Sequence, residues 1–235
     1  MNAKNPYSLN GILVIDKPSG ITSHDVVDAV RRKLKMKQVG HAGTLDPLAT
    51  GVLVILLGQA TKLFNKFSAF DKAYAATITL GIKTDTADIC GNVIDQKPYD
   101  SVTEAQVKEI FKSFLGEIKQ IPPMVSALKH KGKRLYQLAR KGVEVEREAR
   151  HVKIYSLELL EFALPKVKLS LECSKGTYVR KIAEDVGELL GCGGCISQIH
   201  RTKVGPFNIE QAVRLETFSE KDIKRADFSL ERATH

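Results

Sequence analysis

The chain has 235 residues, enough for one large domain or two small ones, and its apolar fraction of 43% is ordinary for a globular protein. Its 36 Lys and Arg outnumber its 27 Asp and Glu and leave a formal net charge of +9. This excess favours an anionic partner, either nucleic acid or an acidic membrane surface, over a neutral metabolite.

Three further sequence features bear on the cellular compartment. No apolar run is long enough to span a bilayer, and the first residues lack the charged-then-apolar pattern of a signal peptide. The four cysteines are too few and too scattered for a disulfide framework, which agrees with a reducing environment. The sequence therefore predicts a cytoplasmic protein.

The first half of the chain mixes strand and helix patterns. Residues 11–17 read as a strand, and 22–35 as an amphipathic helix with Thr22 or Ser23 as N-cap. The run 52–58 is short and β-branched, which predicts a strand covered on both faces. Residues 73–81 alternate like a further strand.

The second half continues without strict strand–helix alternation. A helix is expected over 103–116, opened by a Thr103–Gln106 capping box and closed by glycine. Two β-rich runs meet at a turn at Pro165, and an amphipathic helix is expected over 177–191. These elements predict an α+β fold around a mixed, mostly antiparallel sheet flanked by helices.

One segment has an unusual charge distribution. Residues 121–142 open with two prolines and carry six Lys or Arg, with no acid between Lys129 and Lys141. The segment is either a basic insertion that stands off the sheet and contacts phosphates, or a solvated surface helix. The missing acids and the net charge of the chain favour RNA contact.

A single carboxylate, Asp46, lies in a glycine-rich loop just before the buried run at 52–58. Pro47 disfavours helical geometry at Asp46, so the carboxylate sits on an extended or turn-like backbone. A loop that feeds a buried strand is a rigid mount for a reactive group, although an Asp-Pro pair more often simply forms a turn. The glycine pattern lacks the ending of a phosphate-binding P-loop.

A second candidate site is the stretch 173–182, where Gly176 and Thr177 lead into a helix that presents Tyr178 and Arg180. A helix N-terminus and an arginine both favour a nearby anion, though Arg180 can equally pair with a surface acid. Tyr74 lies on an expected strand, where it is either a core residue or a surface for stacking a base.

Two further patterns resemble functional motifs only weakly. Cys192, Cys195 and His200 form an incomplete zinc set, and no second cysteine pair lies at zinc-ribbon spacing, so no metal is expected. Asp85 and Asp88 resemble a carboxylate pair, but their Thr-Asp spacing suits turn and capping hydrogen bonds better.

Five strings of this sequence, covering roughly residues 10 to 215, resemble the tRNA pseudouridine synthase B (TruB) family in the order seen there. They are DKPSGITSHDVV, GHAGTLDPLATGVLVILLGQATK, DKAYAATITLGIKTDTAD, QIPPMVSALKHKGKRLYQLARKG and CSKGTYVRKIAEDVGELLGCGG. The resemblance implies an enzyme that isomerises uridine 55 in the T-loop of tRNA to pseudouridine.

The resemblance also implies roles for particular residues. Asp46 matches the catalytic aspartate, Tyr74 the tyrosine that stacks on the target base, and Arg180 the arginine that pairs with the catalytic carboxylate. The remaining matches lie around the substrate or beneath it. They are His41, which fills space left by extruded bases; Tyr178 and Ile199, which contact the substrate nucleotide; and Lys17 and Pro18, which pack under the site.

The implied reaction suits these residue types. Pseudouridine formation moves the base from an N1 to a C5 attachment on the ribose, so no atom is gained and no cofactor is required. Asp46 acts either as a nucleophile at C1′ or as a base at C2′, and the sequence leaves both open. The target base leaves the stack for Tyr74, while Lys131, Lys133 and Arg134 of the basic segment hold phosphates.

The sequence departs from the family pattern in two places. The string QIHRT has Ile199 and His200 where Leu-Arg is expected, and no C-terminal RNA-binding domain of the PUA type follows. We expect one catalytic domain over 1–235, with a basic insertion at about 121–151, that acts as a monomer on the T-stem-loop without a membrane. The alternatives are a tRNA folding chaperone that does not need Asp46, and a synthase that acts on another RNA.

Overall fold

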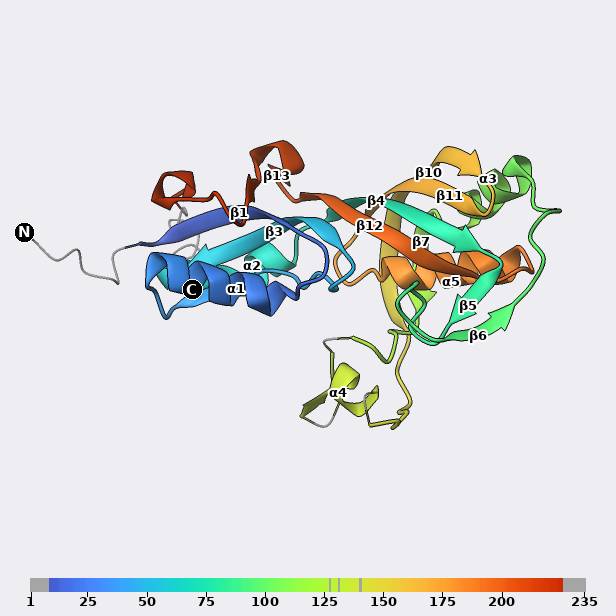
Figure 1. Ribbon diagram of the computed structural model, residues 1–235, viewed down its shortest axis with the longest axis horizontal. Coiled ribbons are helices and arrows are strands. Elements are labelled where there is room, and N and C mark those ends of the chain that lie inside the picture. The colour runs from blue at the N-terminus through green and yellow to red at the C-terminus, as the bar shows by residue number, and fades with distance from the viewer. Residues whose placement is uncertain (1–8, 127, 131, 140, 226–235) are drawn as a thin grey trace, which may run out of the picture. The chain divides into compact units, whose positions relative to one another are not determined.

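A computed structural model describes residues 9–126, 128–130, 132–139 and 141–225 (Figure 1). The chain divides into two compact units, one formed by Met1–Lys72 with His200–His235 and the other by Ala73–Ile199. The second unit is therefore one continuous segment, whereas the first is built from both ends of the chain. Whether the two act as one catalytic domain stays a prediction.

The first unit is organised around β3 (Thr50–Leu57). Strand β1 (Gly11–Lys17) pairs with it antiparallel from Gly11↔Leu57 to Lys17↔Gly51, and β2 (Val39–His41) also pairs antiparallel. The last part of β12 (Gly194–Val204) pairs with β3 in parallel through His200↔Thr50 and Arg201↔Gly51. The predicted strand at 52–58 is confirmed, since all of Gly51–Leu57 is buried.

Helices and short strands complete the first unit. Helix α1 (Ser23–Leu34) begins at the N-cap Thr22, one of the two predicted N-caps, and buries Val26, Val27 and Val30. Thr22 also forms a reciprocal capping box with Asp25, which was not predicted. The remaining elements are short. They are a 3₁₀ helix (Gly58–Leu63), α2 (Phe64–Ser68), β13 (Phe207–Asn208), a 3₁₀ helix (Ile209–Gln211), β14 (Val213–Arg214) and a 3₁₀ helix (Glu220–Asp222).

The second unit holds a sheet with the strand order β12-β4-β11-β10-β7. The members not yet introduced are β4 (Lys72–Leu80), β11 (Lys166–Cys173), β10 (Arg150–Ala163) and β7 (Gly116–Gln120). Strand β10 pairs antiparallel with both β11 and β7. The fold is therefore α+β with mostly antiparallel pairing, as predicted.

Two helices support this sheet. Helix α3 (Glu104–Ser113) has the predicted Thr103–Gln106 capping box, and α5 (Val179–Leu189) buries Ile182 and Val186. The predicted end of α3 at Gly116 was wrong: the helix stops at Ser113, and Gly116, with a φ of +89°, turns the chain into β7.

Two hairpins also belong to the second unit. Strands β5 (Ile82–Thr84) and β6 (Val93–Gln96) pair antiparallel across the predicted turn. In the basic segment, β8 (Lys129–His130) and β9 (Lys133–Arg134) form a separate two-stranded sheet, which α4 (Leu135–Ala139) follows. The segment is thus a hairpin with a short helix and not one surface helix.

Candidate active-site residues

Asp46 lies in the first unit, on the loop that joins β2 to β3, and its side chain is half-buried. The loop is tied to α1 on one side, where the Ser23 hydroxyl donates to the Leu45 carbonyl and the Leu45 amide donates back, at 3.1 and 2.8 Å. The amide of Gly20 donates to the Pro47 carbonyl at 2.8 Å. The residues on both sides of Asp46 are therefore held through hydrogen bonds that do not involve its carboxylate.

Lys17 braces the same loop from beneath. Its side chain is completely buried, and its ammonium group donates to the carbonyls of Pro18 at 2.8 Å, Ile21 at 2.7 Å and Pro47 at 3.4 Å. Burial lowers the pKa of Lys17 to about 8, an effect that the Asp46 carboxylate opposes and the Arg201 guanidinium reinforces. The Lys17 ammonium group is thus close enough to both Asp46 and Arg201 to be affected by their charges.

The lowered pKa of Lys17 predicts a pH dependence of stability. Since the folded pKa of about 8 lies below the ordinary lysine value of 10.5, the unfolded chain binds more protons between these values, so stability rises with pH there. We expect the unfolding free energy of the wild type, relative to Lys17→Met, to increase by roughly 2 to 3 kcal/mol between about pH 7 and about pH 10. Urea titrations of both proteins measure this, and parallel pH curves would contradict it.

Arg201 is a buried cation that the sequence analysis did not single out. Only 1% of its surface is exposed, and it donates to three carbonyl oxygens: Val52 at 2.8 Å, Thr44 at 3.3 Å and Gly43 at 3.1 Å. Its neighbour His200, noted as a departure from the family pattern, makes a 2.8 Å hydrogen bond through Nδ1 with the Thr50 hydroxyl. Both residues of β12 therefore attach to the loop or to the start of β3.

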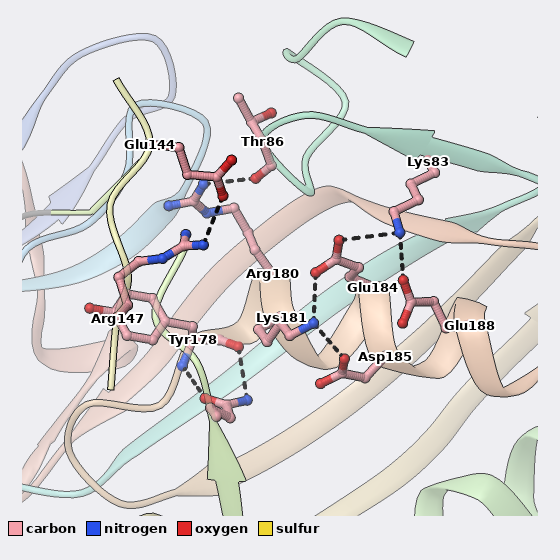
Figure 2. A network of polar contacts seen from close by, with 11 residues as sticks. Lys83, Thr86, Glu144, Arg147, Tyr178, Arg180, Lys181, Glu184, Asp185 and Glu188 are labelled. Atoms are coloured by element: carbon pink, nitrogen blue, oxygen red, sulfur yellow. Dashed lines mark hydrogen bonds and ion pairs between the residues drawn. The ribbon is translucent and has the colours of Figure 1, made fainter. Parts of the chain in front are cut away.

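In the second unit, Arg180 lies in the first turn of α5 with 3% of its surface exposed. It donates to the carbonyls of Thr86 at 2.9 Å and Val125 at 2.7 Å, and it forms an ion pair with Asp88 at 3.4 Å. Figure 2 shows the guanidinium beside the Thr86 carbonyl. The acid that Arg180 meets in this unit is thus buried and not at the surface.

Asp88 combines the role predicted for it with one that was missed. Its Oδ1 accepts hydrogen bonds from the Thr86 hydroxyl at 3.0 Å and from the Cys90 amide at 3.1 Å, as expected of a turn residue. Its Oδ2 faces Arg180, although 92 residues separate the two in the sequence and no local pattern marks the pairing. Asp88 is therefore both a turn former and a partner of Arg180.

Tyr178 is the N-cap of α5 and is half-buried. The buried side chain of Gln120 binds its backbone on both sides: Oε1 accepts from the Tyr178 amide at 3.0 Å, and Nε2 donates to the Tyr178 carbonyl at 3.4 Å (Figure 2). Gln120 was not predicted as a site residue. It fixes the point where α5 begins and hence the direction of the Tyr178 and Arg180 side chains.

The exposed side of α5 carries a network of ion pairs (Figure 2). Lys181 contacts Asp185 at 2.7 Å and Glu184 at 2.9 Å, and Lys83 of β5 contacts Glu188 at 2.5 Å. The hydrogen bond that Lys83 donates to the Glu188 carboxylate raises the pKa of Lys83. Because exposed pairs contribute little to stability, this network fastens the β5 hairpin to α5 only weakly.

The other predicted residues lie on strands or in the basic segment. Tyr74 is half-buried on β4, Ile199 is buried on β12, and His41 is half-buried at the end of β2. Lys133 and Arg134 are exposed on β9, whereas Lys131 lies outside the described residues. Pro18, half-buried, follows Lys17 directly and supplies one of its carbonyl acceptors.

The described ranges contain no group of three or more His, Cys, Asp or Glu side chains that could hold a metal ion. Cys192 and Cys195 are buried, and burial raises the pKa of the Cys195 thiol to about 11, which keeps it in the unreactive protonated form. Within the same ranges no helix is long and apolar enough to cross a membrane.

The chain matches two family models over most of its length. Residues 31–179 match the N-terminal domain of TruB family pseudouridylate synthases, and residues 180–232 match the C-terminal domain of tRNA pseudouridylate synthase B. These matches define the class: the protein is a pseudouridine synthase, an isomerase.

Similar proteins narrow the class further. A tRNA pseudouridine synthase B from Alkaliphilus oremlandii is 52% identical over 208 residues, which cover 88% of this chain and 69% of the relative. One from Clostridium tetani is 46% identical over 225 residues, covering 96% of this chain and 78% of the relative. The chain belongs to the TruB family.

Solved structures agree with this assignment. A crystal structure of a Cbf5-Nop10-Gar1 complex matches with a TM-score of 0.69 and 32% identity, covering 88% of this chain and 52% of that chain. A structure of an H/ACA RNP bound to a substrate RNA containing 2′-deoxyuridine matches with a TM-score of 0.65 and 28% identity, covering 88% of this chain and 51% of that chain.

Proposed function

We propose that the substrate is tRNA and that the reaction converts uridine 55 in the T-loop to pseudouridine. The observation that carries this proposal is the identity of 46 to 52% between this chain and relatives named tRNA pseudouridine synthase B. The net charge of +9 agrees with a polyanionic substrate, since lysines and arginines that neutralise phosphates supply most of the affinity for RNA.

Asp46 is the proposed catalytic residue. In the reaction the C1′–N1 glycosidic bond breaks, the base turns, a C1′–C5 bond forms, and the proton on C5 is lost as N1 gains one, so atoms and electrons balance without an oxidant. An ionised Asp46 either attacks C1′ or removes the proton from C2′, and both roles require a carboxylate in a fixed position. The hydrogen bonds at Leu45 and Pro47 support such a position.

Arg180 and Tyr74 are proposed to complete the catalytic group on the evidence of the family resemblance. Arg180 pairs with the Asp46 carboxylate and favours its charged form. Tyr74 stacks on the flipped uracil and offsets part of the few kcal/mol lost on unstacking the base. The anchoring of Arg180 by Thr86, Val125 and Asp88 supports this role, because an anchored guanidinium meets a carboxylate at little entropic cost.

The remaining residues are proposed to contact the RNA. His41 occupies the space vacated by extruded bases, Tyr178 and Ile199 contact the substrate nucleotide, and the basic segment holds phosphates. Exposure of Lys133 and Arg134 on the β8–β9 hairpin supports the last assignment. Phosphate contacts of this kind make the affinity fall as salt concentration rises.

Mapping the modified nucleotide tests the proposed substrate. Purified protein is incubated with an unmodified tRNA transcript, and pseudouridine is then located by carbodiimide modification and primer extension. We expect one new pseudouridine, at T-loop position 55, and none in a transcript with cytidine at that position. Modification at a different uridine, or of a ribosomal RNA fragment in place of tRNA, would contradict the proposed substrate.

A further inference from the structure

A buried arginine lies beneath the Asp46 loop at a place where the proposed mechanism does not use it. Arg201 is 1% exposed, and the described part of the chain places no carboxylate within ion-pair distance of it. Removing a guanidinium from water is costly unless its donors are satisfied. Here three backbone carbonyls satisfy them, so the positive charge is not neutralised by an acid in direct contact.

The three carbonyls lie on both sides of Asp46 in the sequence. Gly43 and Thr44 precede Asp46 by three and two residues, and Val52 lies six residues beyond it, inside β3. The planar fork of one guanidinium therefore joins the start of the loop to the strand that follows it. A lysine, with a single ammonium group, cannot reproduce this arrangement.

The backbone is shaped to admit Arg201. Strand β12 lies so close to β3 that a Cβ atom added to Gly51 would come within 2.3 Å of the Arg201 carbonyl oxygen, and Gly51 has a φ of +98°. Gly43, with a φ of +107°, turns its carbonyl toward the same guanidinium. The closeness of Arg201 to Gly51 and the positive φ at both positions thus explain why glycine, and not a residue with a Cβ atom, occupies positions 43 and 51.

Arg201 and Asp46 both lie near the Lys17 ammonium group. Both Arg201 and Asp46 act electrostatically on the Lys17 ammonium, so the three charges share one region of the first unit. Other titratable groups of this unit also adjoin the region. They are Asp25 on α1, His41 on β2 and His200 on β12.

We propose that Arg201 is a positioning residue for Asp46: its guanidinium fixes the backbone on both sides of the loop. The inference rests on the proposed catalytic role of Asp46. Arg201 does not touch the substrate in this account. It acts through the loop, so its loss affects the rate of the chemical step and not the affinity for RNA.

Three variants test this inference. Arg201→Lys keeps the positive charge but replaces the guanidinium with a single ammonium group, and Arg201→Met removes the charge. The control is Val204→Ala, three residues further along β12 in the buried core, which lowers stability without changing a contact of the loop. We expect single-turnover rates on a T-stem-loop RNA to fall about 10-fold for Lys and about 100-fold for Met, since small displacements of a reacting group have effects of this order. Val204→Ala keeps the wild-type rate once corrected for its folded fraction.

Two further readouts separate positioning from simple destabilisation. Amide hydrogen exchange at Leu45 and Ala49 accelerates in both Arg201 variants and not in Val204→Ala. The affinity for the RNA stays within about threefold of the wild type in all three, as expected when only transition-state interactions are lost.

The inference is rejected if the Arg201 variants match Val204→Ala in rate and in amide exchange at equal melting temperature. If Arg201→Met does not fold, Arg201→Lys decides: a wild-type rate per folded molecule rejects the inference, and a reduced rate with normal affinity supports it. If Asp46→Asn retains full activity, the proposed function of Asp46 fails instead. If Asp46→Asn is inactive while the Arg201 variants keep the wild-type rate, only the role of Arg201 fails.

Discussion

Replacing Asp46 with Asn removes pseudouridine formation while RNA binding persists. The amide has the shape of the carboxylate but is neither a nucleophile nor a base, so we expect the single-turnover rate to fall by about 1,000-fold or more. The fold is expected to survive, because Leu45 and Pro47 anchor the loop through Ser23 and the Gly20 amide. Measurements are the release of tritium from [5-³H]uridine-labelled T-stem-loop RNA and filter binding of the same RNA.

The control for Asp46→Asn is Asp71→Asn, the same change at an exposed acid of the same unit. We expect this control to keep the wild-type rate and affinity. A protein that acts only as an RNA-folding chaperone would need neither acid, so wild-type function in Asp46→Asn would favour that alternative. Loss of both binding and activity in Asp46→Asn would contradict the division into a catalytic carboxylate and a separate binding surface.

Breaking the Arg180–Asp88 pair has the second large effect, on stability as well as activity. Arg180→Met leaves Asp88 buried without its cation, and a change of this kind lowers the free energy of unfolding by about 3 kcal/mol. Asp88→Asn is milder, at about 1 to 2 kcal/mol, because Thr86 and Cys90 still bind the side chain. Urea unfolding of the two single variants and the double variant measures their coupling.

The double variant is expected to be more stable than the sum of the single losses predicts, by about 1 to 3 kcal/mol, since one interaction cannot be lost twice. The matched control is the exposed pair between Lys83 of β5 and Glu188 of α5, whose coupling stays below about 1 kcal/mol. Additive losses at Arg180 and Asp88 would show that the pair is not energetically linked. We also expect Asp88→Asn to slow the reaction, since Arg180 is then held less firmly.

Local rules were sufficient for most of the secondary structure. The N-cap of α1, the capping box at Thr103 and the apolar run of β3 depend on residues within a few positions of one another. The last two were predicted, and Thr22 was one of two predicted N-caps. The end of α3 was missed because either a glycine or the next strand can stop a helix. The basic segment was ambiguous because its charges have no periodicity that distinguishes a hairpin from a helix.

The supporting residues of the site were beyond the reach of local patterns. Arg180 was predicted as a site residue from its place at the start of a helix. Asp88 was predicted only as a turn residue and not as the partner of Arg180, because only the tertiary fold brings the two together. Arg201 gave no signal, since an arginine in a strand is usually exposed. Gln120 was also missed. Its side chain binds the backbone of a helix that is distant in the sequence, and no pattern in the residues around Gln120 indicates this contact.

The discontinuous first unit has a consequence for synthesis of the chain. Thr44 and Arg201 are 157 residues apart, so at about 5 to 20 residues per second the ribosome makes the loop roughly 10 to 30 s before the arginine that braces it. The second unit is continuous in sequence and is complete by Ile199. A nascent chain therefore carries the Asp46 loop without this brace until Arg201 has been made, and translation products that stop before Arg201 lack the brace altogether.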